Sequence, residues 1–318
     1  MAEWLIERGI GETRALLVEG ERVLAAKLHW PGEAGTGVVQ ARLVRRPAGA
    51  TRGLARTADG LEINVSGLPK DVSEGREVAV AITRAPMAEK GRLKRAQGQF
   101  RAEGGTAEAP PAHLEGKVVH RFPAGLWEDM WADAWDGEIA FAGGSLVVSP
   151  TPAMTLIDID GDLPPRELAL AAVPALADTL RRLDIAGSIG IDFPTLPEKA
   201  QRRAVDIALG DALDGWPHER TAMNGFGFVQ LVARLEGPSL LHRLHFSRTP
   251  AAARMLLRRG ELAEGAGPRL LLSANPAIID RLAPEWLAEL ARRSGRRVET
   301  ARDPALALHA GHAQVLAS

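Results

Sequence analysis

Short apolar runs separated by turn residues dominate the first third of the chain and predict β-strands. Between Trp4 and Trp30, two such runs flank the turn-like Glu19-Gly20-Glu21, which is typical of a hairpin. A segment rich in Pro and Gly follows at residues 31–37. Strand-like segments then recur at a spacing of about ten residues, a pattern that predicts a small β-barrel. These segments are residues 38–43, 51–56, 61–65 and 78–83.

Beyond Lys117, helical periodicity alternates with strand-like segments, which is typical of an α/β layer. Residues 126–135 form the pattern of an amphipathic helix. Its tryptophans, Trp127, Trp131 and Trp135, are expected in the core, with a subunit contact as the alternative. Strands are expected at 138–141, 145–149, 154–160, 188–193 and 225–235, and helices at about 165–183 and 197–213, with Pro174 kinking or restarting the first helix.

Helices dominate from Pro238 onward, with short strands expected at 269–273 and 297–300 around a helix at 284–293. The 318 residues, of which 46% are apolar, can bury a core large enough for about two domains. Cysteine is absent, so disulfides, thiolate zinc sites and cysteine nucleophiles are excluded. The opening residues lack a basic signal region and no apolar run approaches the roughly 18 residues of a membrane span. We therefore expect a cytoplasmic protein that has no membrane segment.

The formal charge is −1, but basic residues cluster in the segment from Arg84 to Arg101, which contains six basic residues and a single acidic residue, Glu89. Such a cluster can contact phosphates even in a nearly neutral protein. The alternative is a solvated basic linker. Residues 97–111 are rich in Gly, Ala, Glu and Pro, so we expect a linker there. The candidate phosphate contacts are Lys90, Arg92, Lys94 and Arg95.

Three aspartates carry the candidate chemistry. Asp158 and Asp160 lie two residues apart on an expected strand, so their side chains share one face of the sheet. Asp192 ends the next expected strand, and pairing of the two strands would place it beside Asp158. Like charges are tolerated at such positions where a cation lies between them, and magnesium prefers carboxylate oxygens. The alternative is that these aspartates cap the helices that follow.

The order and spacing of motifs from Leu146 to Leu240 resemble the catalytic core of the ribonuclease E/G family. Residues 3–30 resemble the opening segment of that family more loosely, 38–83 its S1-like barrel, and 268–315 its small C-terminal domain. The motifs of the core are Leu156-Ile157-Asp158-Ile159-Asp160, Leu180-Arg181-Arg182-Leu183-Asp184-Ile185-Ala186-Gly187, Ile189-Gly190-Ile191-Asp192-Phe193, Arg202-Arg203-Ala204-Val205, Gly225-Phe226-Gly227-Phe228-Val229 and Pro238-Ser239-Leu240.

This resemblance implies that Asp158 and Asp192 are the metal ligands of a catalytic site, with Mg²⁺ as the expected ion and Mn²⁺ as the alternative. Asp160 stands where the family usually has asparagine, and we count it with the catalytic residues. The implied reaction is hydrolysis of single-stranded RNA by metal-activated water, which leaves a 5′-phosphate and a 3′-hydroxyl. The alternatives are an RNA-binding homologue with impaired catalysis and a phosphoesterase acting on another nucleic acid or nucleotide.

The chain also departs from the family pattern. Between Lys117 and Trp127 it is too short for the family's 5′-monophosphate sensor. Without cysteines it has no zinc link between subunits, so a monomer or dimer is expected in place of the zinc-linked tetramer. Gly225 replaces an arginine and Gln230 a glutamate. No aromatic residue occurs from Pro31 to Gln99, which removes the usual base-stacking residues of the barrel.

The fold class implied is α+β with several domains. A DNase I-like α/β catalytic layer is expected, together with an inserted S1-like barrel of the oligonucleotide-binding type and a mixed small C-terminal domain. The expected boundaries are 1–30 for the first strands of an RNase H-like subdomain, 31–96 for the barrel, 97–116 for the linker, 117–237 for the catalytic region and 238–318 for the small domain.

Overall fold

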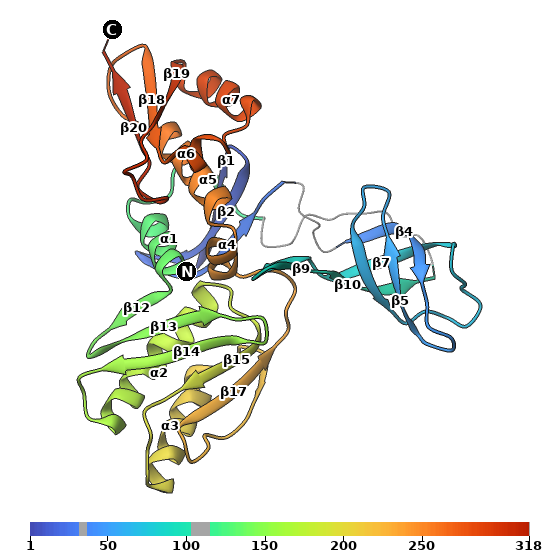
Figure 1. The fold of residues 1–318 in the computed structure, drawn as a ribbon. Helices are drawn as coiled ribbons and strands as arrows, with labels where there is room; N and C mark the ends of the chain where they lie inside the picture. Colours follow the sequence, from blue (N-terminus) through green and yellow to red (C-terminus); the bar gives the residue numbers. More distant parts are fainter. Residues whose placement is uncertain (32–36, 103–114, 318) are drawn as a thin grey trace. The chain divides into compact units, whose positions relative to one another are not determined.

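In the computed structural model, residues 1–31, 37–102 and 115–317 are described. The rest of the Pro- and Gly-rich segment, and most of the predicted linker, lie outside the described residues. The fold is α+β, with a closed five-stranded barrel and several open sheets (Figure 1). The chain divides into two compact units, each built from segments that are far apart in the sequence. Unit 1 comprises residues 1–31, 116–131 and 243–318, and unit 2 comprises residues 32–115 and 132–242.

Unit 1 contains a four-stranded sheet in the order β11-β1-β2-β3. The predicted hairpin is confirmed: β2 and β3 are antiparallel neighbours, and Gly20 in their turn has a φ of +62°, which favours glycine. β11 returns from the middle of the chain to pair in parallel with β1. The strands are β1 (Glu3–Gly9), β2 (Glu12–Glu19), β3 (Arg22–His29) and β11 (Lys117–Val119).

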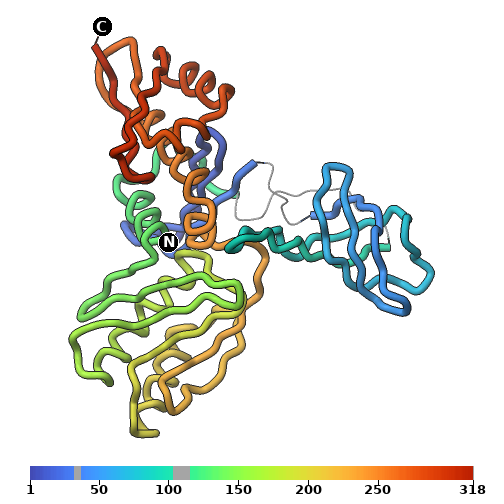
Figure 2. Tube along the Cα trace, in the orientation of Figure 1, coloured from blue at the N-terminus to red at the C-terminus, as the bar shows by residue number. Residues whose placement is uncertain are grey.

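The C-terminal part of unit 1 is a three-stranded sheet in the order β19-β18-β20, together with helices. Figure 2 shows the blue, green and orange-to-red stretches of unit 1 lying beside one another. The elements are α5 (Arg248–Glu261), β18 (Arg269–Ala274), α6 (Pro276–Ile279), α7 (Pro284–Ser294), β19 (Arg297–Arg302) and β20 (His312–Leu316); α4 (Leu240–Phe246) precedes them at the boundary between the units.

A buried charge network joins the sheet of unit 1 to α5. Arg14, which has no exposed surface, donates hydrogen bonds to Glu7 at 2.5 Å and to Glu12 at 2.7 Å. Arg258 donates from Nε and Nη2 to the two oxygens of Glu7, at 2.7 and 3.2 Å. It also contacts Glu128. Each buried charge in this network therefore has an opposite charge beside it, as burial requires.

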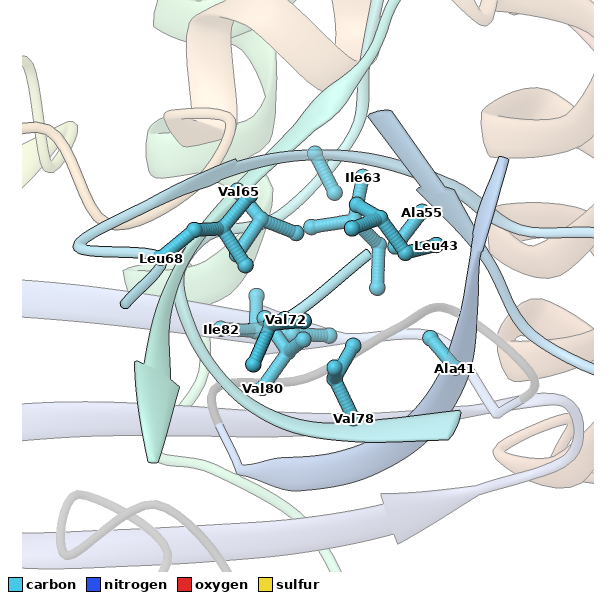
Figure 3. Packing of buried hydrophobic residues seen from close by; sticks show 11 residues of the cluster. Ala41, Leu43, Ala55, Ile63, Val65, Leu68, Val72, Val78, Val80 and Ile82 are labelled. Carbon is cyan, nitrogen blue, oxygen red and sulfur yellow. The ribbon is translucent and has the colours of Figure 1, made fainter. Parts of the chain in front are cut away.

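Unit 2 begins with the barrel, whose strands close in the order β10-β6-β5-β4-β7 around an aliphatic core (Figure 3). Leu43, Ile63 and Val80 have no exposed surface in this core. The strands are β4 (Val38–Arg45), β5 (Arg52–Arg56), β6 (Glu62–Ser66), β7 (Glu77–Arg84) and β10 (Ala96–Arg101).

The position of β10 corrects the expected linker, because residues 97–101 form the strand that closes the barrel. β10 pairs in parallel with β6 and antiparallel with β7, and Phe100 packs against the barrel core. Buried and exposed residues alternate along β10, as in a strand with one face toward a core. The buried positions are the small residues Ala96 and Gly98, and the exposed ones are Gln97 and Gln99. Their low hydrophobicity is the reason that the sequence suggested a linker.

Between β7 and β10, a separate hairpin forms from β8 (Met87–Glu89) and β9 (Arg92–Lys94). Two hydrogen bonds connect its start to the segment after the six-stranded sheet. The amide of Ala85 donates to the carbonyl of Glu236 at 2.9 Å, and His242 Nε2 donates to the carbonyl of Ala88 at 2.6 Å. The hairpin is therefore attached within unit 2 at both of these points.

The second part of unit 2 is a six-stranded sheet in the order β12-β13-β14-β15-β17-β16. Its helices α2 and α3 pack against each other, and α2 contacts β12, β13 and β14 (Figure 1). The elements are β12 (Glu138–Phe141), β13 (Gly144–Pro150), β14 (Thr155–Gly161), α2 (Pro165–Arg182), β15 (Gly187–Asp192), α3 (Lys199–Ala212), β16 (His218–Arg220) and β17 (Phe228–Ala233). The helix before them, α1 (Leu126–Asp136), begins in unit 1 and ends in unit 2.

The helix predicted at 126–135 is confirmed as α1, and Trp127, Trp131 and Trp135 are all at least 94% buried within the chain. The predicted restart at Pro174 is wrong, since α2 is a single helix that contains this proline. Pro174 is exposed, so water can satisfy the carbonyl of Leu170 that loses its helical hydrogen bond. Within the described residues, none of the helices has the length and apolar character needed to cross a membrane.

Candidate functional site

Asp158 and Asp192 lie directly opposite each other on the parallel strands β14 and β15. Neighbouring strands are about 4.8 Å apart, so the two Cα atoms are close, and in-register side chains project from the same face. Both aspartates are exposed, whereas Ile157 and Ile191 beside them in the sequence have no exposed surface. The predicted pairing of the two acidic strand segments is confirmed.

The exposure of these carboxylates follows from the layers of unit 2. α2 packs against β13 and β14, where Ile157 and Ile159 are buried. The alternate positions Leu156, Asp158 and Asp160 are exposed, so they lie on the uncovered face of β14. One oxygen of Asp158 accepts a hydrogen bond from the amide of Ile159 at 3.0 Å. This bond restrains the carboxylate and leaves its other oxygen available to a ligand.

Apolar side chains surround the carboxylate pair on this face. Val147 is opposite Asp158 on β13, and Phe228 is opposite Asp192 on β17. One pair further along, a Cβ atom at Gly190 would lie 2.5 Å from Cζ of Phe228 and 3.0 Å from Leu156. The glycine therefore allows the Phe228 ring to lie against the sheet beside the aspartates.

The alternative that the three aspartates cap helices is wrong. The residue at the N-cap of α2 is Pro164 and that of α3 is Glu198, and neither helix has a side-chain cap. Across the described ranges, no three or more His, Asp or Glu side chains are grouped to hold a metal ion. Two exposed carboxylates still match Mg²⁺, which binds through one or two carboxylates and takes its other ligands from water and substrate phosphates. The donor set of Asp158 and Asp192 therefore fits this ion.

The predicted phosphate contacts are divided between two places. Lys90, Arg92 and Lys94 belong to the β8–β9 hairpin, and Arg95 precedes β10. Arg92 and Lys94 form ion pairs with Glu89, at 2.6 and 3.2 Å. Burial opposes ionisation of Glu89, but these hydrogen bonds prevail and lower its pKa. Three of the four cations are thus ion-paired, because Arg95 pairs with Glu62. Lys90, in contrast, is exposed and has no ion pair within the described part of the chain.

The barrel has its own candidate nucleic-acid interface. A cavity of about 550 Å³ opens over β5, β6 and β10, and Arg45, Arg52 and Arg95 contribute to its lining. Asn64, Ser66 and Gln97 add hydrogen-bonding groups to the same cavity. Arg95 also pairs with Glu62 at 2.6 Å. The exposed side chains of Arg45 and Arg52 are the basic groups of this cavity that sequence analysis missed. The available signal was that Arg45 follows the expected strand 38–43 by two residues and that Arg52 lies near the start of the expected strand 51–56.

A tight turn holds the loop before β17 near Asp192. The Asn224 side chain accepts hydrogen bonds from the amides of Phe226 and Phe228, at 2.9 and 3.1 Å. Gly227 has a φ of +92°, and a Cβ there would lie 2.3 Å from the carbonyl oxygen of Phe193. Gly225, in contrast, has open space around its Cα. Phe226 between them is 80% exposed, which the sequence did not indicate.

A comparison of the chain with models of known protein families finds no match.

Proposed function

We propose that this protein is a magnesium-dependent endoribonuclease of the ribonuclease E/G type that cleaves single-stranded RNA. The observation that carries the proposal is the in-register pair Asp158 and Asp192 on the uncovered face of the six-stranded sheet. Mg²⁺, or Mn²⁺ in its place, would be held by these two carboxylates. When bound, the ion would supply Lewis acidity toward the phosphate and activation of the attacking water.

The architecture supports the same proposal. In this proposal, the α/β layer with its acidic strands serves as the DNase I-like catalytic layer, and the closed five-stranded barrel between β3 and β11 serves as the inserted S1-like domain. The arginines of the barrel cavity can contact the phosphates of a single strand, whose negative charge dominates binding. In this proposal Asp158 and Asp192 position the scissile phosphate, and the barrel binds another part of the same RNA strand.

The absence of a 5′-end sensor is part of the proposal. Residues 120–125 alone connect β11 to α1, which leaves no room for the inserted strands that such a sensor needs. We expect similar cleavage rates for 5′-monophosphorylated and 5′-hydroxylated RNA. Without cysteines the zinc-linked tetramer is not available, and we expect a monomer or dimer.

The test is cleavage of these two RNAs by the wild type, Asp158→Ala and Asp192→Asn, each with magnesium and with EDTA. We expect magnesium-dependent cleavage by the wild type that leaves 5′-phosphate ends, and none by either variant. Both positions are exposed, so circular dichroism should show folded variants. Asp211→Asn, an exposed acid on α3, is the matched control and should cleave normally. Full activity of Asp192→Asn would overturn the proposal.

A second function is favoured by two substitutions relative to the family. Asp160 adds a negative charge where asparagine is usual, and Gly225 removes a cation, so the protein would bind RNA without cleaving it. Magnesium-independent RNA binding without cleavage would support this alternative. Cleavage of DNA or of a nucleotide in competition with RNA would instead indicate a phosphoesterase of different specificity.

A further inference from the structure

Phe226 is the most exposed large apolar side chain of the described residues after Met1. Its exposed fraction of 80% exceeds the 65% of Leu93 and the 49% of Val232. It is also the only aromatic residue among the strongly exposed apolar side chains of the part that the structure describes. Exposure of a complete phenyl ring loses the free energy of its burial, so a ring kept at this position is available to a ligand.

The turn around Phe226 fixes its backbone. Asn224 accepts from the amides on both sides of Gly227, and the amide of Asn224 donates to the carbonyl of Phe228 at 3.1 Å. The hydroxyl of Thr195 donates to the carbonyl of Phe226 at 3.5 Å. A ring on a backbone restrained in this way loses little conformational entropy when a partner stacks on it.

The turn also limits the distance between Phe226 and the carboxylate pair. Phe228 is opposite Asp192 in the sheet, and the amide of Phe193 donates to the carbonyl of Gly227 at 3.2 Å. The spacing of paired strands and of consecutive Cα atoms then brings the Cα atoms of Phe226 and Asp192 within about 13 Å of each other. If an RNA strand binds with one phosphate at Asp158 and Asp192, a base of a neighbouring nucleotide is therefore within reach of the Phe226 ring.

The barrel offers no equivalent ring. No aromatic residue occurs from Pro31 to Gln99, and Phe100 packs against the barrel core. The cavity lined by Arg45 and Arg52 can bind phosphates, but it has no aromatic side chain on which a base could stack. Among the described residues at the barrel cavity and around the carboxylate pair, Phe226 is thus the strongly exposed aromatic side chain.

We propose that Phe226 stacks on an unpaired base of the RNA strand next to the phosphate bound at Asp158 and Asp192. The proposal rests on the proposed nuclease function and adds to it the residue that positions the nucleotide beside the cut. Stacking on an aromatic face tolerates every base, so this contact selects single strands without selecting a sequence.

The test measures affinity and cleavage with Phe226→Leu, which keeps an apolar side chain, and Phe226→Trp, which keeps an aromatic one. Each is assayed on RNA that carries a single abasic site at successive positions around the mapped cut. We expect Phe226→Leu to weaken binding of intact RNA by about 5- to 150-fold, and Phe226→Trp to retain it. Val232→Ala, another exposed apolar position on this sheet, is the control and should bind as the wild type does.

The abasic series identifies the stacked base. In the wild type, one abasic position should weaken binding by the same factor as Phe226→Leu, and in Phe226→Leu that position should cost nothing further. A 2-aminopurine base at that position should be quenched on binding to the wild type but not to Phe226→Leu. Equal abasic penalties in both proteins would overturn the proposal, as would normal binding by a folded Phe226→Leu.

Failure of this proposal is distinguishable from failure of the nuclease. Magnesium-dependent cleavage that is unaffected by Phe226→Leu contradicts stacking and retains the nuclease. RNA binding that depends on Phe226 without any cleavage contradicts the nuclease and retains stacking. A wild type that neither binds nor cuts RNA overturns both.

Discussion

Arg258 donates hydrogen bonds to both carboxylate oxygens of Glu7, although 251 residues separate the two in the sequence. Both side chains are at least 95% buried. Removing one member of such a pair leaves an uncompensated charge in the interior. We expect Arg258→Met to lower the free energy of unfolding by about 3 kcal/mol, measured by urea denaturation at pH 7. Arg292→Met removes an exposed ion pair with Glu289 and should have little effect.

The same pair predicts a stability that depends on pH. Burial opposes ionisation of Glu7, but its hydrogen bond from Arg258 and the charges of Arg14 and Arg258 hold its pKa below the ordinary value of 4.5. Its contribution is therefore present above about pH 4.5 and is lost as the pH falls toward the folded-state pKa. We expect a shallower fall in stability between pH 4.5 and 3 for Glu7→Gln than for the wild type. Parallel stability profiles would contradict this assignment.

Asp160 provides a test of charge at the candidate metal centre. Two positions along β14, its side chain lies about 7 Å from that of Asp158 on the same exposed face. At that distance a carboxylate attracts a divalent ion by about 1 kcal/mol in water. We expect Asp160→Asn to raise the half-saturating magnesium concentration by about fivefold, measured from cleavage rates and from Mn²⁺ binding. The control Asp211→Asn should change neither the magnesium dependence of cleavage nor the affinity for Mn²⁺. If Asp160→Asn also changes neither, no ion binds beside Asp160.

Gly225 and Gly227 differ in the space available for a Cβ atom. Nothing lies within 4 Å of a Cβ at Gly225, whereas one at Gly227 would collide with backbone and adopt a φ of +92°. We expect Gly225→Arg to fold normally and to steepen the salt dependence of RNA affinity by about 0.7 in a log–log plot, as for one added phosphate contact. Gly227→Ala should instead lose at least about 1 kcal/mol of stability. If the salt dependence of RNA affinity is the same in Gly225→Arg as in the wild type, the bound RNA does not pass close to residue 225.

Arg45 and Arg52 test the barrel cavity. We expect Arg45→Ala and Arg52→Ala each to weaken RNA binding and to reduce the salt slope by about 0.7, without loss of stability. Arg46 is the matched control, because it donates hydrogen bonds to the carbonyls of Ala50 and Pro69, at 2.8 and 2.7 Å. Arg46→Ala should lower the thermal unfolding temperature of the barrel. If Arg45→Ala and Arg52→Ala both show the salt dependence of the wild type, the cavity is not the surface that binds RNA.

The sequence was most informative where spacing alone determines geometry. Asp158 and Asp160 follow the period of a strand, and the pairing of Asp158 with Asp192 could be predicted because two acidic strands next to each other in the chain are also neighbours in the sheet. The hairpin at Gly20 and the buried tryptophans of α1 were predicted for similar local reasons.

Other features depend on contacts that no local pattern encodes. β10 buries Ala96 and Gly98, whose small side chains give no strand signal, and its place in the barrel depends on pairing with β6. The pairing of β11 with β1 joins segments more than a hundred residues apart. The exposure of Phe226 results from the turn at Asn224, since a phenylalanine between glycines reads equally well as a buried strand end.

The discontinuous make-up of unit 1 has a consequence for synthesis on the ribosome. Glu7 enters the growing chain early, but its partner Arg258 follows only after all of unit 2 has been made. At about 5 to 20 residues per second, translation separates the two by tens of seconds. During that interval the barrel and the acidic sheet can complete their own pairings. In β1 and β2, Glu7 and Glu12 then have Arg14 as their shared cation, which leaves one carboxylate charge uncompensated until Arg258 is added. A released chain that ends at residue 242 should therefore contain a protease-resistant unit 2 and a protease-sensitive N-terminal hairpin.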